Sequence, residues 1–151
     1  MLAPANAAQF TLVIPTVRND FKVLAFEGTD TISALYSVNV DLVSEYPDID
    51  LERLLNQPAF LQLGLNGEGI HGHIAGVSAG DVGKRLTRYR VNLVPALHYL
   101  QFSHDQRIFQ GQTVPQIIAK VLKGHGIQAD AFTFHVKTSP EREYCTQYRE
   151  N

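Results

Sequence analysis

An alternation of apolar and polar side chains between residues 32 and 42 constrains the fold of this chain more than any other feature. The odd positions are mostly polar, and the even positions are all apolar: Ile32, Ala34, Tyr36, Val38, Val40 and Leu42. Successive side chains of a β-strand point to opposite faces of a sheet, so this pattern predicts a long strand with one buried face. Shorter strands are predicted at residues 10–14, 21–26, 59–65, 69–77 and 86–94. The chain is therefore predicted to be mainly β.

Turn and helix signals divide these strands. Asn66-Gly67 lies between two of them and readily supplies the positive φ angles of a tight hairpin turn. A short helix is expected near residues 51–55, and a longer one from Thr113 as N-cap to a cap at Gly124, where apolar residues recur at helical spacing. Residues 131–136 resemble another strand. Residues 141–151 carry no terminating signal, so we expect an element that continues past the chain.

Composition excludes several classes of protein. The 151 residues are 44% hydrophobic and 19% charged, which is typical of a globular domain and not of a disordered chain. The net charge of -2 leaves no basic surplus for nucleic acid or an anionic membrane. Residues 1–9 lack the pattern of a secretory signal, and no apolar run approaches the length of a membrane helix. The single Cys145 allows no internal disulfide.

One motif imitates a cofactor site. The residues Gly67-Glu68-Gly69-Ile70-His71-Gly72 match the G-x-G-x-x-G pattern of dinucleotide-binding proteins. That pattern binds a pyrophosphate only where its glycines lead from a strand into a helix, and here they lead into another strand. No acidic residue follows about twenty positions later. We predict a hairpin and no bound cofactor.

Two histidines supply the alternative from another functional class. His71 and His73 alternate with Gly72, so on a strand both imidazoles lie on one face, about 7 Å apart. Two ligands at this spacing can reach one metal ion, but a site needs a third, and the other histidines are scattered. A metal-dependent or ligand-binding β-barrel therefore stays open as an alternative. We find no catalytic constellation and expect no enzyme activity.

One basic cluster suggests a surface for a protein partner. Lys84, Arg85, Arg88 and Arg90 follow one another closely. Most clusters of this kind are solvated surface, but arginine is enriched in protein interfaces. An acidic protein surface is the partner that this cluster would bind.

The order of motifs resembles VgrG, the valine-glycine repeat spike proteins of type VI secretion systems, from about Phe10 to the end. The most specific pieces are Phe26-Glu27-Gly28 with Ile32-Ser33, the strand from Tyr89 to Pro95 with Leu97 and Leu100 after it, Arg107-Ile108-Phe109-Gln110, and Tyr144-Cys145-Thr146-Gln147-Tyr148-Arg149-Glu150. None of these is a catalytic signature.

The resemblance implies a small β-barrel of the phage tail-hub type, followed by the start of a mixed α/β region. It implies a flexible N-terminus at residues 1–8, a first hub barrel at 9–108 and an incomplete α/β segment at 109–151. Family members are several times longer, so we expect this chain to be a fragment. The implied role is structural: a module that caps the secretion tube and adapts threefold to sixfold symmetry. A hub protein of a prophage or tailocin is the alternative within the same architecture.

The resemblance also implies partners and a location. The partners are further copies in a homotrimer, the hexameric tail-tube protein, and other spike or effector proteins, with no nucleic acid and no stable membrane association. The location is the bacterial cytoplasm before firing, then export through the type VI system without a signal peptide. Tyr144, Gln147 and Tyr148 are the residues expected at an interdomain or intersubunit interface. No cofactor or metal is implied.

Overall fold

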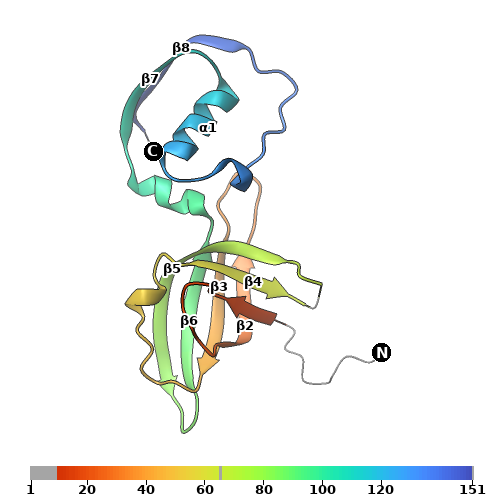
Figure 1. The fold of residues 1–151 in the computed structure, drawn as a ribbon, viewed down its shortest axis with the longest axis vertical. Coiled ribbons are helices and arrows are strands. Elements are labelled where there is room, and N and C mark those ends of the chain that lie inside the picture. Colours follow the sequence, from red (N-terminus) through yellow and green to blue (C-terminus); the bar gives the residue numbers. More distant parts are fainter. Residues whose placement is uncertain (1–9, 65, 151) are drawn as a thin grey trace. The chain divides into compact units, whose positions relative to one another are not determined.

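The computed structural model describes residues 10–64 and 66–150, which form two compact units that meet in sequence between Pro95 and Ala96 (Figure 1). The expected flexible segment at residues 1–8 lies outside the described residues. The expected boundary after residue 108 falls inside a strand of the second unit. The contacts within this chain therefore divide it after Pro95, earlier than residue 108. The expected limits of the hub barrel domain, 9–108, stay a prediction.

The first unit is a six-stranded antiparallel sheet that curls into a nearly closed barrel. Its strands are β1 (Phe10–Val13), β2 (Lys22–Thr29), β3 (Ser37–Ser44), β4 (Pro58–Leu63), β5 (Gly69–Val82) and β6 (Thr87–Val94). They pair in the order β1-β4-β5-β6-β3-β2. The two end strands approach each other, and the rings of Phe10 and Phe26 meet edge to face at 5.2 Å. This contact nearly closes the sheet and confirms the mainly β, barrel-like fold.

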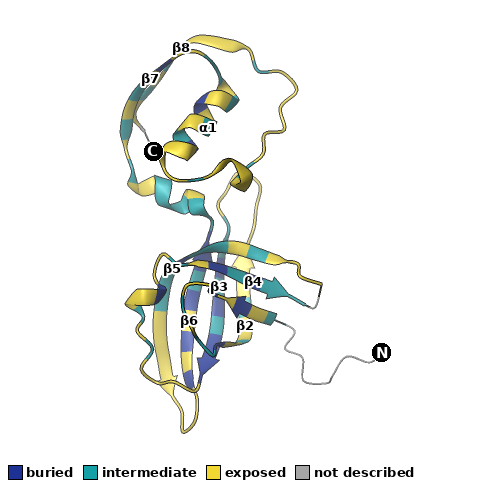
Figure 2. Cartoon of the chain, viewed as in Figure 1, coloured by how far each residue is buried: buried dark blue, intermediate teal, exposed yellow. Residues whose placement is uncertain are grey.

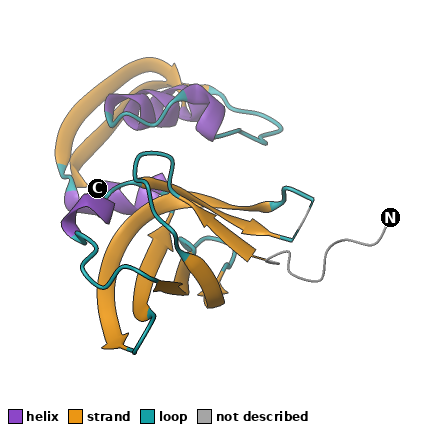
Figure 3. Ribbon diagram, turned by 60° about the horizontal axis from the view of Figure 1, so that its bottom comes forward, coloured by secondary structure: helices purple, strands orange, loops and turns teal. Residues whose placement is uncertain are grey.

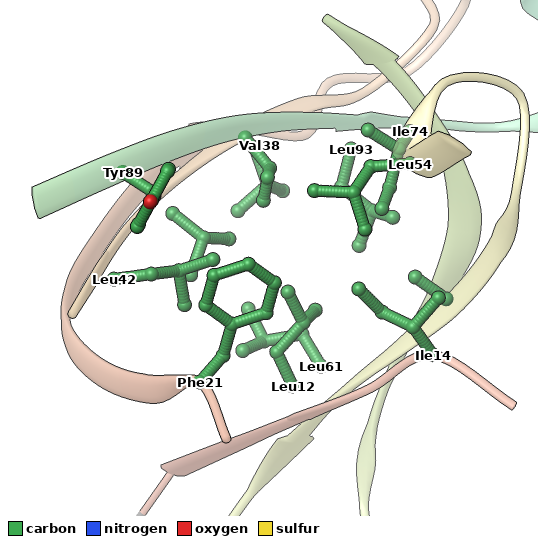
Figure 4. Close-up of a cluster of buried hydrophobic side chains, with 13 residues drawn as sticks. Leu12, Ile14, Phe21, Val38, Leu42, Leu54, Leu61, Ile74, Tyr89 and Leu93 are labelled. Carbon is green, nitrogen blue, oxygen red and sulfur yellow. The ribbon is translucent and has the colours of Figure 1, made fainter. Parts of the chain in front are cut away.

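The barrel core lies between the inward faces of these strands (Figures 2 and 4). Its buried residues are Leu12, Ile14, Phe21, Val38, Val40, Leu42, Leu54, Ala59, Leu61, Ile74, Tyr89, Val91 and Leu93. Leu54 enters this core from the 3-10 helix η1 (Glu52–Leu54), where the sequence predicted a short helix. Strands β3, β4 and β6 contribute alternate residues to it, as the strand period of two requires.

Two predicted strands need correction. The long strand begins at Ser37 and not at residue 32, because Ala34 N–H bonds Thr31 O in a turn and Ser33 adopts a φ of +65°. The side chain of Ile32 is 99% exposed, so the local turn outweighs the alternating pattern. Residues 131–136 form no strand, and only a 3-10 turn, η3 (Ala129–Ala131), lies near them.

The second unit contains the 3-10 helix η2 (Ala96–Phe102), strand β7 (Asp105–Thr113), helix α1 (Val114–Gly124) and strand β8 (Glu141–Glu150). β7 and β8 pair antiparallel, and α1 lies on the concave side of this curved pair (Figure 3). Thr113 is the N-cap as predicted, and its N–H donates to the Gln116 side chain at 2.8 Å. The helix ends in a Schellman motif, in which Ile127 N–H bonds Leu122 O and Gly126 adopts a φ of +83°.

Candidate interaction surfaces

The outer face of the β7–β8 pair carries two of the three residues expected at an interface. The register places Gln106 opposite Tyr148, Ile108 opposite Thr146, and Gln110 opposite Tyr144, and directly opposed residues share one face. The side chains of Ile108, Tyr144 and Tyr148 are 67%, 64% and 63% exposed. This face therefore combines large apolar and aromatic groups with amides, a composition suited to a protein contact.

Gln147, the third expected residue, lies on the opposite face of the same strand. It pairs with Arg107 in the register and is half-buried, as is Cys145 opposite the buried Phe109. The Lys120 ammonium of α1 sits 5.8 Å from the centre of the Phe109 ring on this side. The structure thus separates Gln147 from Tyr144 and Tyr148, and the role of all three in an interface stays a prediction.

A hydrogen-bonded polar ladder crosses the outer face of the barrel. Arg90 on β6 donates twice to the Asp41 carboxylate on the neighbouring β3, at 2.6 and 3.1 Å. These bonds from Arg90 hold the pKa of Asp41 below its usual value. The adjacent Asn92 amide donates to Ser37 Oγ at 2.8 Å and to Asn39 Oδ1 at 2.9 Å.

This ladder changes the interpretation of the basic cluster. Arg90 is paired with Asp41, whereas Lys84 and Arg85 lie exposed between β5 and β6. The sequence identified the arginine but missed its partner, because the two residues are 49 positions apart. Alternation indicates that both face outward; only the register of β3 and β6 brings them together.

His71 and His73 lie on β5, where the register places them opposite Phe60 and Pro58. The His71 ring stacks on the Phe60 ring, with centroids 4.2 Å apart. Within the described residues, no group of three or more histidine, cysteine, aspartate or glutamate side chains could hold a metal ion. His71 and His73 are therefore neighbouring residues on the surface of β5, and His71 makes an aromatic contact with Phe60.

The glycine motif lies at the predicted hairpin between β4 and β5, where its Gly67 adopts a positive φ, as does Gly64, which precedes the motif. Its later glycines allow close approach of strands. A Cβ at Gly69 would lie 2.3 Å from Leu61 O, and one at Gly72 would lie 2.6 Å from Val94 O. These glycines are explained by strand packing, and none of them leads into a helix as a dinucleotide site would require.

A hollow of about 350 Å³ opens at one end of the barrel, and no local pattern in the sequence predicted it. Aromatic and aliphatic side chains form most of its wall, among them Phe26, Tyr36 and Ile70. The Tyr36 hydroxyl donates to His71 O and spans from the start of β3 to β5. Burial, together with the nearby Asp30 carboxylate, raises the pKa of Tyr36.

The nearly closed antiparallel barrel and the strand–helix–strand unit that follows it in the chain match the fold of phage tail-hub proteins. The model of the phage tail baseplate hub (GPD) family matches residues 29–151. The chain belongs to this family.

The relatives of the chain include spike proteins. It is 53% identical to the type VI secretion system spike protein VgrG5 of Pseudomonas aeruginosa over 99% of this chain. It is 51% identical to VgrG4b of the same organism over 100% of this chain. The alignments cover only 19% of either relative, so the chain spans about a fifth of their length.

A solved structure has the same fold. The Escherichia coli c3393 protein, described as a component of the type VI secretion system with structural similarity to the bacteriophage T4 tail proteins gp27 and gp5, superposes with a TM-score of 0.82 at 31% identity. The match covers 93% of this chain and 39% of that one. Among the helices that the structure describes, none is long and apolar enough to cross a membrane.

Proposed function

We propose that the chain is a non-enzymatic structural module of a type VI secretion spike, in which its barrel forms part of the hub that caps the tube. The observation that carries this proposal is the hub barrel itself, matched at 51–53% identity by type VI spike proteins along almost the whole chain. These relatives favour a type VI spike over a prophage or tailocin hub, which the genes beside this one would also distinguish.

The proposed mechanism is mechanical. Three copies of the hub present barrels to a hexameric tube protein and so adapt threefold to sixfold symmetry. An antiparallel barrel suits this task, because cross-strand hydrogen bonds and a dry core resist deformation. The module waits in the bacterial cytoplasm and then leaves with the spike, without a signal peptide. Nucleic acid and membranes are not among the proposed partners.

The second unit is proposed to begin the mixed α/β region that follows the barrel. Its exposed face, with Tyr144 and Tyr148, and the half-buried Gln147 on the other side of β8 would contact further parts of a longer spike polypeptide or a neighbouring subunit. Large aromatic side chains on an exposed sheet face support this, since such groups are enriched where proteins meet.

A chimera tests the proposal directly. The segment of VgrG5 that aligns with this chain would be replaced by this chain, and release of tube protein into the medium would be measured. We expect release comparable to that of the parent spike. The control chimera carries Leu61→Asp, which places a charge in the barrel core and should abolish release. A stable chimera that releases no tube protein would contradict the proposed function.

A further inference from the structure

Among the described residues, the last residues of β2 form a strand edge of the barrel that is open on one side. β2 is one end strand of the sheet, and β1 is the other. The ring of Phe26 on β2 contacts the ring of Phe10, which is the first residue of β1. Residues 27–29 lie past this contact and are exposed. Within the described residues, no strand pairs with this side of β2. An edge of this kind presents backbone N–H and C=O groups to which another strand can bond.

The inner side of this edge leads into the apolar hollow at the barrel end. Gly28 opposes Val38 in the register, and both line the hollow with Phe26, Tyr36 and Ile70. A Cβ at Gly28 would lie only 2.8 Å from the Val38 side chain and 3.0 Å from Ser37 O, so a larger residue here would force β3 to shift. A large side chain on an added neighbouring strand could cover the bare backbone of Gly28, as aromatic residues do beside edge glycines.

The outer side of the same edge carries a second hollow, of about 360 Å³ and polar character. Glu27 and Thr29 line it from β2, and their register partners Asn39 and Ser37 line it from β3. Glu27 thus contributes a carboxylate to the outer hollow, as Asp30 does to the inner one.

These carboxylates give the edge an acidic character. Arg90 is near enough to interact electrostatically with Glu27, but its guanidinium is held by two bonds to Asp41. The charge pattern therefore favours basic groups on a molecule that binds at this edge.

We propose that an extended segment of a partner protein adds as a strand to β2 at residues 27–29. Alternate residues of an added strand point to opposite faces, so the residue beside Gly28 enters the inner hollow and its two neighbours face the outer one. The segment that fits carries a large apolar residue flanked by lysine or arginine. Backbone bonds supply affinity in such binding, and the two hollows supply specificity. The inference stands apart from the hub role, because it rests on described residues of the first unit alone.

Binding of a synthetic peptide tests this proposal on the intact chain. The probe is a capped heptapeptide, Ser-Thr-Lys-Phe-Lys-Thr-Ser, with a neutral fluorophore, followed by fluorescence anisotropy at low salt. Two further peptides carry N-methyl groups on alternate backbone amides. The first peptide is methylated at the odd-numbered residues and the second at the even-numbered residues. We expect one methylated peptide to lose about tenfold or more in affinity and the other to bind like the parent, because only one set of amides faces β2. Equal binding by both methylated peptides, or no binding by the parent, would overturn the proposal.

Protein variants locate the site. Glu27→Gln should weaken binding about threefold to tenfold at low salt and less at high salt, since the lost attraction is electrostatic. The matched control is Glu52→Gln, which neutralises an exposed carboxylate of η1 outside both hollows and should leave binding unchanged. Amide NMR shifts on peptide addition should centre on residues 25–30. Self-association of the free chain that the peptide reverses would make a second copy the occupant and would refute a partner protein.

Discussion

Tyr89 connects the barrel core to a loop through a single hydroxyl group. The side chain is buried, its ring meets Phe21 edge to face at 5.5 Å, and its oxygen lies 2.8 Å from both Tyr46 O and Pro47 O. Tyr89→Phe keeps the ring but removes the donor to these carbonyls. We expect a loss of about 1–2 kcal/mol in the free energy of unfolding, measured by urea titration. The control Tyr148→Phe alters an exposed residue and should change stability little; equal losses would contradict this role.

Asp20 secures the end of β3 and gives stability a dependence on pH. Partial burial raises the pKa of Asp20, but bonds from Ser44 Oγ and from the backbone N–H of Glu45, with Lys22 nearby, lower it overall. A lowered folded-state pKa means that the stabilisation is complete above the usual value of 3.8 and is lost as pH falls through the folded value.

The corresponding experiment compares Asp20→Asn with the parent chain. At pH 7 the variant should be less stable by about 1 kcal/mol, and this difference should shrink as pH falls below about 4. Asp48→Asn, an exposed position in the following loop, is the control. A stability difference that stays constant down to pH 2 would contradict the assigned role of the carboxylate.

At the scale of elements, the two glycines at the end of α1 differ in whether their backbone conformation tolerates a side chain. Gly126 adopts a φ of +83°, where a Cβ is unfavourable, so Gly126→Ala should cost about 1 kcal/mol. Gly124 is the last helical residue, and a Cβ there would meet only the flexible end of Arg107, at 3.4 Å. Gly124→Ala should therefore be neutral or stabilise by a few tenths of a kcal/mol. Thermal unfolding followed by circular dichroism separates the two; equal losses would refute this assignment.

Elements were predictable from the sequence to the extent that their signals are local. Alternation located the barrel strands, and Thr113 located the start of α1. Alternation failed at Ile32, where a turn and the positive φ at Ser33 replace the expected strand. It did not decide the state of β8 either, because Tyr144 and Tyr148 share a face at spacing four in a strand as well as in a helix.

Local sequence patterns did not predict which strands pair when those strands are distant in the chain. The bond between Arg90 and Asp41 depends on the register of β3 with β6, which are separated in the chain by the β4–β5 hairpin. The two hollows beside Gly28 likewise depend on which strands meet at the barrel end. The exposed tyrosines of the expected interface were identifiable, whereas the edge of β2 emerged only from the fold.

At the scale of the whole molecule, the first unit contains its own hydrophobic core, as an independently folding domain requires. Every member of its core cluster precedes Pro95, from Leu12 to Leu93. A chain ending at Pro95 should therefore give a dispersed NMR spectrum, with slow amide exchange in β3 and β6, two strands that have a neighbour on both sides. A spectrum typical of an unfolded chain would show that the barrel needs the second unit.

The proposed hub role predicts how spike and tube subunits would combine. Native mass spectrometry of the spike that contains this barrel, mixed with the tube protein of the same genome, tests it most directly. We predict a complex in which three spike chains bind six tube subunits, and its loss when Leu61→Asp disrupts the barrel core. A spike that remains strictly monomeric and ignores the tube protein would contradict the account.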